Sequence, residues 1–336
     1  MSRPTVFVAR SIPEEALSIL REYLDVDMWP DEDVNPPREE IIKHIEGKVG
    51  VLTLLTDKMD AEVMDAAPNL KIISNYAVGY DNIDIKAATE RDILVTNTPE
   101  VLTETVADLA FALILAAARG IVKYDAIIRR REWKGAWKPM LFLGSDVYEK
   151  TLGIIGLGRI GAAVAKRARG FNMRILYSDV VRRKELEREL EVEYTSLEEL
   201  LRSSDYVSVH VPLMKDTHHL IGAKELDLMR STAFLFNTSR GPVVDEQALY
   251  KALKEGKIAG AGLDVFEVEP IPDDNPLIGL DNMVLVPHIG SASRETRINM
   301  GLLAANALVD FLVKKRAPKY MVNPEVLDRH GIKRED

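Results

Sequence analysis

A glycine-rich turn, Gly156-Leu-Gly158-Arg-Ile-Gly161, follows the apolar run Leu152–Ile155 and precedes the helical pattern Ala162–Arg169. Gly156 permits a tight turn, Gly158 lets the backbone approach a pyrophosphate, and Gly161 lets a helix pack closely on a strand. The N–H groups at the start of that helix then bind phosphate. Glycines alone would fit any tight turn, but the strand–turn–helix context predicts a dinucleotide site.

The residue that would choose between dinucleotides is Asp179, which follows the next expected strand, Arg174–Tyr177. A carboxylate there accepts hydrogen bonds from the adenosine ribose hydroxyls and repels a 2′-phosphate, so Asp179 favours NAD over NADP. Arg182 and Arg183 follow closely and are able to pair with that phosphate, which keeps NADP as an alternative. Both arginines also suit the exposed start of a charged helix over Arg182–Leu190.

Three charged or titratable residues lie where further strands are expected to end. Arg240 follows an apolar run, Glu269 follows a run of small residues, and His288 follows a Val-Pro dipeptide. Taken singly, they fit a surface ion pair, a turn carboxylate and a loop histidine. Because ligands of open α/β sheets bind at the carboxyl ends of the strands, their joint occurrence after a dinucleotide turn indicates one functional site.

Composition excludes several other kinds of site. The chain has 336 residues, 44 Lys and Arg, 53 Asp and Glu, and no Cys. The lack of Cys excludes a disulfide scaffold, a Cys-ligated metal and a cysteine nucleophile, and no His or carboxylate spacing indicates another metal site. The net charge of −9 argues against nucleic acid and anionic membranes as partners, although it permits an acidic small molecule in a locally positive site.

Neither the N-terminus nor the longest apolar stretch of the sequence indicates a membrane protein. The opening Met-Ser-Arg-Pro-Thr-Val lacks the apolar region of a signal peptide. The longest nearly apolar stretch, Leu109–Ala118, is shorter than the roughly 20 residues that span a bilayer. We therefore expect a cytoplasmic protein.

Short β-branched runs alternate with helical patterns along the chain, which predicts an α/β fold with parallel sheets. Two of the helices have apparent N-caps, Ser11 and Ser196, each with Glu three residues later. The expected strands are Thr5–Val8, Val49–Leu52, Lys71–Ser74, Leu152–Ile155, Arg174–Tyr177, Tyr206–Val209, Ala233–Phe236 and Met283–Val286.

The position of the glycine-rich turn predicts two domains. Such a turn normally follows the first strand of its domain, yet here it comes after residue 150, so another βα domain must precede it. We predict that the chain crosses between domains near Asn97–Pro99 and near Pro287–Gly290. Residues 1–97 with 289–336 would form one domain, and residues 98–288 would form the dinucleotide-binding Rossmann domain.

These motifs, in this order, resemble the D-isomer-specific 2-hydroxyacid dehydrogenase family, and within it most closely the archaeal glyoxylate reductases. The resemblance spans nearly the whole chain and includes Asn75-Tyr-Ala-Val-Gly-Tyr-Asp-Asn-Ile-Asp84, Gly153–Gly161, His210-Val-Pro-Leu213, Ser239-Arg-Gly241, Gly260–Pro270 and Pro287-His-Ile-Gly290. It implies that Arg240, Glu269 and His288 are catalytic, and that the backbone of Val78 and Gly79, with Arg240, binds the substrate carboxylate. It also implies that the Rossmann domain is inserted into a flavodoxin-like substrate-binding domain.

The same resemblance implies a set of cofactor contacts around the glycine-rich turn and at the strand ends. They are Val106, Gly156, Gly158, Arg159, Ile160, Gly161, Asp179, Val180, Arg182, Val211, Pro212, Thr217, Thr238, Ser239, Gly241, Asp264, His288 and Gly290. Some archaeal relatives carry a Ser-Arg-type sequence where this chain has Ser178-Asp179-Val180. That departure strengthens NAD as the expected cofactor, with NADP as the alternative.

The implied reaction is NAD(P)H-dependent reduction of a short 2-keto acid, glyoxylate or hydroxypyruvate, to the 2-hydroxy acid. Arg240 would hold the substrate, His288 would donate a proton, and Glu269 would orient the imidazole and favour its charged form. D-3-phosphoglycerate dehydrogenases and other D-2-hydroxyacid dehydrogenases share this framework, as do NAD-binding co-repressors that act as scaffolds. Glu269 argues against a formate dehydrogenase, which carries Gln there.

The helix expected over Thr103–Arg119 has no polar face between Leu109 and Ala118, so it must be covered nearly all round. The loop Gly120–Val147, with its large aromatic side chains, would cover it if it folded back. The resemblance implies instead a homodimer paired through this helix and the following loop. We favour the homodimer.

Overall fold

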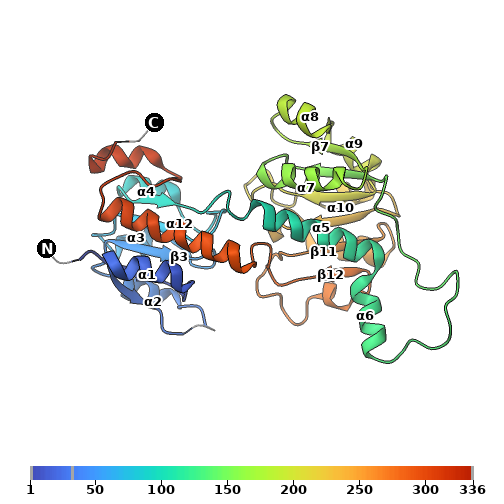
Figure 1. Ribbon diagram of the computed structural model, residues 1–336, viewed down its shortest axis with the longest axis horizontal. Helices are drawn as coiled ribbons and strands as arrows, with labels where there is room; N and C mark the ends of the chain where they lie inside the picture. Colours follow the sequence, from blue (N-terminus) through green and yellow to red (C-terminus); the bar gives the residue numbers. More distant parts are fainter. Residues whose placement is uncertain (1–2, 32–33, 334–336) are drawn as a thin grey trace. The chain divides into compact units, whose positions relative to one another are not determined.

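The computed structural model describes residues 3–31 and 34–333 (Figure 1). The chain divides into two compact units: unit 1 is Met1–Leu102 with Ala292–Asp336, and unit 2 is Thr103–Ser291. Unit 2 is therefore an insertion in the chain of unit 1.

Unit 1, in its described part, carries a five-stranded parallel sheet in the order β2-β1-β3-β4-β5. The strands are β1 (Thr5–Val8), β2 (Asp25–Met28), β3 (Gly50–Thr53), β4 (Ile72–Asn75) and β5 (Leu94–Thr96). The helices are α1 (Glu14–Tyr23), α2 (Arg38–Ile45), α3 (Ala61–Asp65), α4 (Ile85–Glu90) and α12 (Arg294–Leu312), followed by the 3-10 helix η3 (Pro324–His330). This strand order is that of the flavodoxin-like fold.

The last helix, α12, completes the core of unit 1. It packs against α1, β3 and β4. At Gly301 a Cβ would lie 2.9 Å from the Cβ of Ala16, so glycine permits the close approach of α12 to α1. Buried Ala304, Ala305 and Leu308 fill the same helix face, which explains why this segment joins unit 1 although it comes at the far end of the sequence.

Unit 2 is built on a seven-stranded parallel sheet in the order β12-β11-β10-β9-β6-β7-β8, counted over residues 103–291. The strands are β6 (Thr151–Ile155), β7 (Arg174–Ser178), β8 (Glu193–Tyr194), β9 (Tyr206–Val209), β10 (Phe234–Asn237), β11 (Gly260–Leu263) and β12 (Met283–Leu285). The order reverses at β6, which is the switch point of a Rossmann fold. The predicted α/β class with parallel sheets is confirmed.

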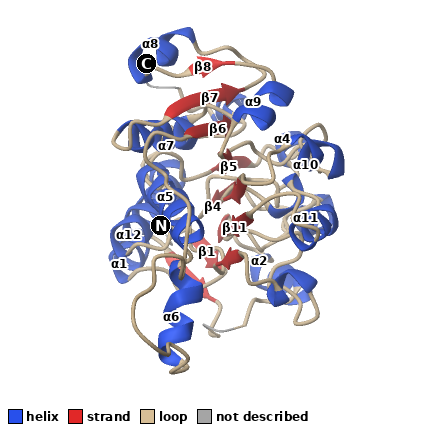
Figure 2. Cartoon of the chain, turned by 90° about the vertical axis from the view of Figure 1, so that its right-hand side faces the viewer, coloured by secondary structure: helices blue, strands red, loops and turns tan. Residues whose placement is uncertain are grey.

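Helices cover both faces of the unit 2 sheet. They are α5 (Thr103–Arg119), α6 (Ile121–Arg129), α7 (Arg159–Arg169), α8 (Lys184–Leu190), α9 (Leu197–Ser203), α10 (Ala223–Leu228) and α11 (Glu246–Lys254), with 3-10 helices η1 (Gly241–Val243) and η2 (Pro276–Gly279). Figure 2 shows α7 and α9 on opposite sides of β6 and β7. Two separate apolar clusters result, one around α5 and α7 and one around α9, α10 and α11.

Two details of the helices bear on the sequence predictions. Ser196 caps α9 as predicted, with its hydroxyl accepting the Glu199 N–H at 3.2 Å. Ser11 is not an N-cap, because α1 begins at Glu14 and Pro13 takes the cap position. Pro13 disfavours the helical conformation in Ile12, the residue before it, so the helix cannot begin directly after Ser11.

Within the described residues, no single helix is both long enough and apolar enough to cross a membrane. The pair α5 and α6, bent by 63° at their junction, meets that length and composition test only when the two helices are taken together.

Candidate functional site

The glycine-rich turn joins β6 to α7 and is tightly packed on one side only. A Cβ on Gly156, whose φ is +91°, would lie 2.8 Å from Val211 Cγ1, and a Cβ on Gly161 would lie 2.2 Å from the Gly156 carbonyl oxygen. At Gly158, in contrast, no heavy atom of the described residues lies within 4 Å of a Cβ position. No side chain caps the start of α7. The open side therefore fits an anionic group bound by backbone N–H donors.

Asp179 lies directly after β7 and faces the same turn. Its two carboxylate oxygens accept the Leu157 N–H at 2.9 Å and the Val181 N–H at 3.1 Å. These bonds fix the carboxylate beside the glycine-rich turn, where a ribose of a bound dinucleotide would lie. Val180, which was also predicted as a contact, is 98% exposed.

Arg182, a predicted cofactor contact, is engaged by protein groups. Its guanidinium makes two hydrogen bonds to Glu187, at 2.8 and 2.9 Å, and lies over the ring of Tyr194. The hydrogen bonds from Arg182 and from the Tyr177 hydroxyl lower the pKa of Glu187 to about 2. Glu187 thus stays charged, and in this structure Arg182 is paired with it.

The loop after β10 carries Thr238, Ser239, Arg240 and Gly241. Asn237, at the end of β10, organises it: its side-chain oxygen accepts the Ser239 N–H and hydroxyl at 3.0 and 2.8 Å, and its amide donates to the Arg240 carbonyl at 2.8 Å. Asn237 was not among the predicted site residues, although an Asn that ends a buried strand often organises the loop that follows.

The buried hydroxyl of Thr238 has no hydrogen-bond partner among the residues that the structure describes. An unsatisfied buried hydroxyl costs free energy, so it is suited to a ligand that supplies the missing bond. The open side of the glycine-rich turn and the unpaired Thr238 hydroxyl together show that the residues of this site fit a dinucleotide.

Glu269 and His288 form a short hydrogen bond, 2.6 Å between Oε2 and Nδ1. Because a carboxylate only accepts, Nδ1 carries the hydrogen and Nε2 is left for proton exchange. The other Glu269 oxygen accepts the Phe266 N–H at 3.0 Å. Burial raises the pKa of Glu269, but the hydrogen bonds from His288 and Phe266 and the charges of His288 and Arg240 outweigh it, so this pKa lies below its ordinary value.

Arg240 lies near enough for its charge to help lower the pKa of Glu269, and its guanidinium donates to the Ser239 carbonyl at 2.9 Å. The loop that carries Arg240 touches the loop that carries Glu269. At Gly241 a Cβ would lie 1.9 Å from the carbonyl carbon and oxygen of Phe266, so only glycine permits the contact. The structure thus brings Arg240, Glu269 and His288 together on the carboxyl side of the unit 2 sheet, as expected from their places after strands.

Asp264 holds the loop that carries His288. Its carboxylate accepts the Ile289 N–H at 2.6 Å and the Gly290 N–H at 2.9 Å, and its carbonyl accepts the His288 N–H at 2.8 Å. His288 has a left-handed φ of +52°, which these bonds hold in place. Burial raises the pKa of Asp264 to about 6.

The other predicted contacts lie around these loops. A Cβ on Gly290 would lie 3.5 Å from Val106 of α5. In the loop after β9, the Thr217 hydroxyl donates to the Pro212 carbonyl at 2.6 Å and accepts the Met214 N–H at 2.7 Å. Arg159 and Ile160 begin α7.

His210 follows β9, and its Nε2 lies 2.8 Å from Ser208 Oγ. Burial lowers the pKa of His210 to about 4, so its imidazole stays neutral.

Val78 and Gly79 lie in unit 1, in the loop after β4. The Asn97 amide donates to the Val78 carbonyl, and the Asn75 amide donates to the Gly79 carbonyl, both at 2.8 Å. Among the described residues, the backbone N–H groups of Val78 and Gly79 have no acceptor. They are therefore available to bind a carboxylate.

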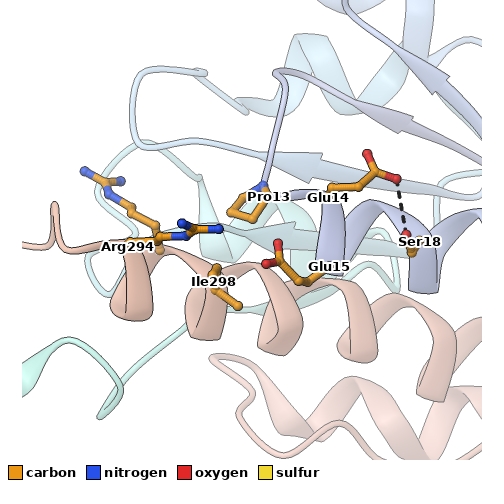
Figure 3. A pocket seen from close by; sticks show the side chains of 7 residues that line it. Pro13, Glu14, Glu15, Ser18, Arg294 and Ile298 are labelled. Atoms are coloured by element: carbon orange, nitrogen blue, oxygen red, sulfur yellow. Dashed lines mark hydrogen bonds between the residues drawn. The ribbon is translucent and has the colours of Figure 1, made fainter.

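A cavity elsewhere in unit 1 contains none of the predicted site residues. It has a volume of about 620 Å³, lies between the first turns of α1 and α12 (Figure 3), and is lined by Pro13, Glu14, Glu15, Ser18, Arg294, Arg297 and Ile298. Residues 3–31 and 34–333 contain no group of three His, Asp or Glu side chains placed to hold a metal ion.

Comparison with known proteins agrees with this geometry. The family described as "D-isomer specific 2-hydroxyacid dehydrogenase, NAD binding domain" matches residues 111–290. The glyoxylate reductase of Korarchaeum cryptofilum is 57% identical over 97% of each chain, and that of Pyrococcus horikoshii is 54% identical over 97% of each.

Solved structures give the same result. The TT0316 protein of Thermus thermophilus superposes with a TM-score of 0.89 at 46% identity, covering 95% of this chain and 99% of its own. An NADPH-dependent glyoxylate/hydroxypyruvate reductase of Sinorhizobium meliloti, solved with NADP and malonate, has a TM-score of 0.84 at 33% identity and covers 96% of this chain and 98% of its own. The chain is an enzyme of the D-isomer-specific 2-hydroxyacid dehydrogenase family, with that family's NAD-binding domain.

Proposed function

We propose that this enzyme reduces a short 2-keto acid, glyoxylate or hydroxypyruvate, to the 2-hydroxy acid with NADH, and that it does so in the cytoplasm. The observation that carries the proposal is the 2.6 Å Glu269–His288 hydrogen bond, held next to Arg240 at the edge of a dinucleotide-binding sheet. The names of the relatives, which are glyoxylate and hydroxypyruvate reductases, support the choice of substrate.

In the proposed mechanism, NADH supplies the hydride that C2 of the keto acid accepts. Arg240 donates hydrogen bonds to the substrate carboxylate and carbonyl oxygen, and so favours the negative charge that develops on that oxygen. His288, protonated, donates its Nε2 hydrogen to the same oxygen. Glu269 holds the imidazole through Nδ1 and stabilises its positive charge.

The remaining predicted residues take binding roles in this proposal. In this proposal unit 1 (Met1–Leu102 with Ala292–Asp336) is the substrate-binding domain, and its Val78 and Gly79 N–H groups bind the substrate carboxylate. Unit 2 (Thr103–Ser291) is the NAD-binding domain, so the boundaries lie three to five residues beyond the expected ones at 97 and 289. Gly156, Gly158 and Gly161 admit the pyrophosphate, and the Thr238 hydroxyl bonds to the dinucleotide. The other contacts implied by the resemblance line the same site.

A panel of 2-keto acids tests the substrate proposal. Oxidation of NADH should be fastest with glyoxylate or hydroxypyruvate and slower with pyruvate and with the 2-keto acid of D-3-phosphoglycerate. Preference for the phosphorylated acid would replace the proposal by a phosphoglycerate dehydrogenase. If no keto acid is reduced while NADH still binds, the scaffold alternative replaces it.

The cofactor preference gives a separate prediction. Asp179, fixed by two backbone N–H groups, repels a 2′-phosphate, and Arg182 is paired with Glu187. We expect kcat/KM to be higher with NADH than with NADPH by about tenfold or more, which corresponds to about 1.4 kcal/mol. Asp179→Ser should narrow the ratio, mainly through a lower KM for NADPH. Higher kcat/KM with NADPH in the unmodified enzyme would contradict the prediction.

We also propose a homodimer formed through α5 and the segment Gly120–Val147, which was expected to be a loop but contains α6 (Ile121–Arg129). No residue of α6, all of which are described, is buried within the chain. In the loop, Trp137 is 80% exposed and Met140 is 78% exposed, so the loop does not cover α5 with its large side chains. Figure 1 shows α6 and this loop projecting from the rest of unit 2. Burying such a surface against a second copy removes apolar area from water.

The mass in solution tests the dimer. Sedimentation equilibrium at micromolar concentration should give twice the chain mass of 37.6 kDa. Ile128→Asp, at a position 53% exposed on α6, should shift the mass toward a single chain. The matched control is Val34→Asp, at a position 55% exposed in unit 1, which should leave the dimer intact. A mass of one chain for the unmodified protein would refute the proposal.

A further inference from the structure

In the loop after β4, every carbonyl from Ala77 to Tyr80 accepts a hydrogen bond from another group of the protein. The Ala77 carbonyl accepts the Thr98 N–H at 2.9 Å, and the Val78 carbonyl accepts the Asn97 amide at 2.8 Å. The Gly79 carbonyl accepts the Asn75 amide at 2.8 Å. The Tyr80 carbonyl accepts the Ile83 N–H at 3.0 Å.

These hydrogen bonds also determine the directions of the Val78 and Gly79 N–H groups, because a peptide unit is planar. Among the described residues, the only cis peptide is Glu269–Pro270, so the peptides on both sides of Val78 are trans. In a trans peptide the carbonyl and the following N–H point in opposite directions. The Thr98 bond to the Ala77 carbonyl therefore directs the Val78 N–H away from Thr98, and the Asn97 bond to the Val78 carbonyl directs the Gly79 N–H away from Asn97.

We infer that Asn97 is a positioning residue for substrate binding, because its amide sets the peptide plane that presents the Gly79 N–H to the substrate carboxylate. This inference rests on the proposed function. Asn97 lies just after β5 and is half-buried, and the bond it donates spans two loops that are far apart in the sequence. Without that bond the peptide between Val78 and Gly79 is free to rotate, and the paired donors lose their common direction.

The loop has a second anchor that does not depend on Asn97. Tyr76 is buried, and its hydroxyl donates to the carbonyl of Arg297 in the first turn of α12. Burial raises the pKa of Tyr76 to about 12, so this hydroxyl keeps its hydrogen across the physiological range. Loss of the Asn97 amide should therefore alter one peptide without releasing the whole loop, and Asn97 variants should fold.

Kinetics and ligand binding of Asn97→Ala test the inference. The KM for glyoxylate should rise about tenfold and kcat should change less than about twofold, because the carboxylate is bound equally in the ground and transition states. The Kd of oxamate, a carboxylate-bearing isostere of a 2-keto acid, titrated into the enzyme–NADH complex, should rise by the same factor. The Kd of NADH should not change.

Two further variants make the test specific. Asn97→Asp keeps the shape but cannot donate and places a negative charge near the substrate, so its KM should rise more than that of Asn97→Ala. Asn306→Ala is the matched control, since the Asn306 amide also donates to a backbone carbonyl at 2.8 Å in the same unit. It should leave the KM for glyoxylate unchanged.

Several outcomes would overturn the inference. A KM and oxamate Kd within twofold of the unmodified enzyme would show that Asn97 does not orient the donor. A fall in kcat, in Tm and in NADH affinity together would show a general structural role. If the unmodified enzyme reduces no 2-keto acid, the proposed function fails first, which is a result distinct from either of these.

Discussion

Replacing His288 by Gln is expected to lower kcat for keto-acid reduction by about 10²- to 10⁴-fold, the range typical of a lost proton donor. Gln keeps a polar side chain but cannot transfer a proton to the developing alkoxide. The affinity for NADH should change little, which separates a loss of chemistry from a loss of binding. Steady-state kinetics with glyoxylate, together with an NADH titration, measure both.

A second His–carboxylate pair supplies the control. His44 Nδ1 lies 3.1 Å from an Asp27 oxygen in unit 1, and neither residue is a predicted site residue. His44→Gln should leave kcat within about twofold of the unmodified enzyme. Equal losses in the two variants would mean that the effect comes from stability, and an unchanged kcat in His288→Gln would exclude His288 as the proton donor.

The effect of Glu269 on His288 should be measurable in the pH dependence of keto-acid reduction. Reduction requires the protonated imidazole, so the rate falls as pH rises. Glu269 stays ionised because its pKa lies below the ordinary carboxyl value, so its negative charge lies beside His288, with 2.6 Å between Oε2 and Nδ1. Glu269→Gln removes that charge, so the fall should move to lower pH by about one unit. A profile that does not move would remove Glu269 from this role.

Gly241→Ala should lower activity nearly as much as His288→Gln, although glycine carries no side chain that takes part in the reaction. The added Cβ would lie 1.9 Å from the backbone carbonyl carbon and oxygen of Phe266, and a backbone group cannot move aside as a flexible side chain can. The two loops must separate, which displaces Arg240 from Glu269 and His288. We expect kcat/KM to fall by about 10²-fold or more, and the free energy of unfolding to fall by about 1–3 kcal/mol.

Gly279 provides a control of the same kind. It also lies in a 3-10 helix of unit 2, and no heavy atom of the described chain lies within 4 Å of its Cβ position. Gly279→Ala should therefore leave both kcat/KM and the unfolding midpoint near those of the unmodified enzyme. Retained activity in Gly241→Ala would show that the loops tolerate separation.

The parts of the fold that sequence patterns predict well are those with strong local signals. The expected strand Tyr206–Val209 has the observed bounds of β9, because four consecutive apolar or small residues lie buried between two other strands. The edge strand β2 was not predicted. In Asp25-Val-Asp-Met28 polar residues alternate with apolar ones and none of the four is buried, so the segment lacks the continuous apolar run of the predicted strands. The edge strand β8 was missed because it has two residues.

The same distinction holds for the site. Arg240, Glu269 and His288 could be predicted to share one sheet edge, since each follows a strand of a parallel sheet. The contact between Gly241 and Phe266 could not, because it depends on how two separate loops pack against each other. For the same reason no sequence pattern indicates that Asn97 would hold the carbonyl of Val78, which lies in another loop.

The insertion of unit 2 into the chain of unit 1 sets an order of folding during synthesis. Domains generally fold as units while the ribosome extends the chain. Residues 103–291 are complete before α12 has been made, and α12 is the helix that covers β3, β4 and α1. The internal unit can therefore fold on the ribosome, whereas the unit that begins the chain must wait for the last segment. Until then the nascent chain exposes one apolar face of an unfinished sheet, and this is the interval in which it most needs a chaperone.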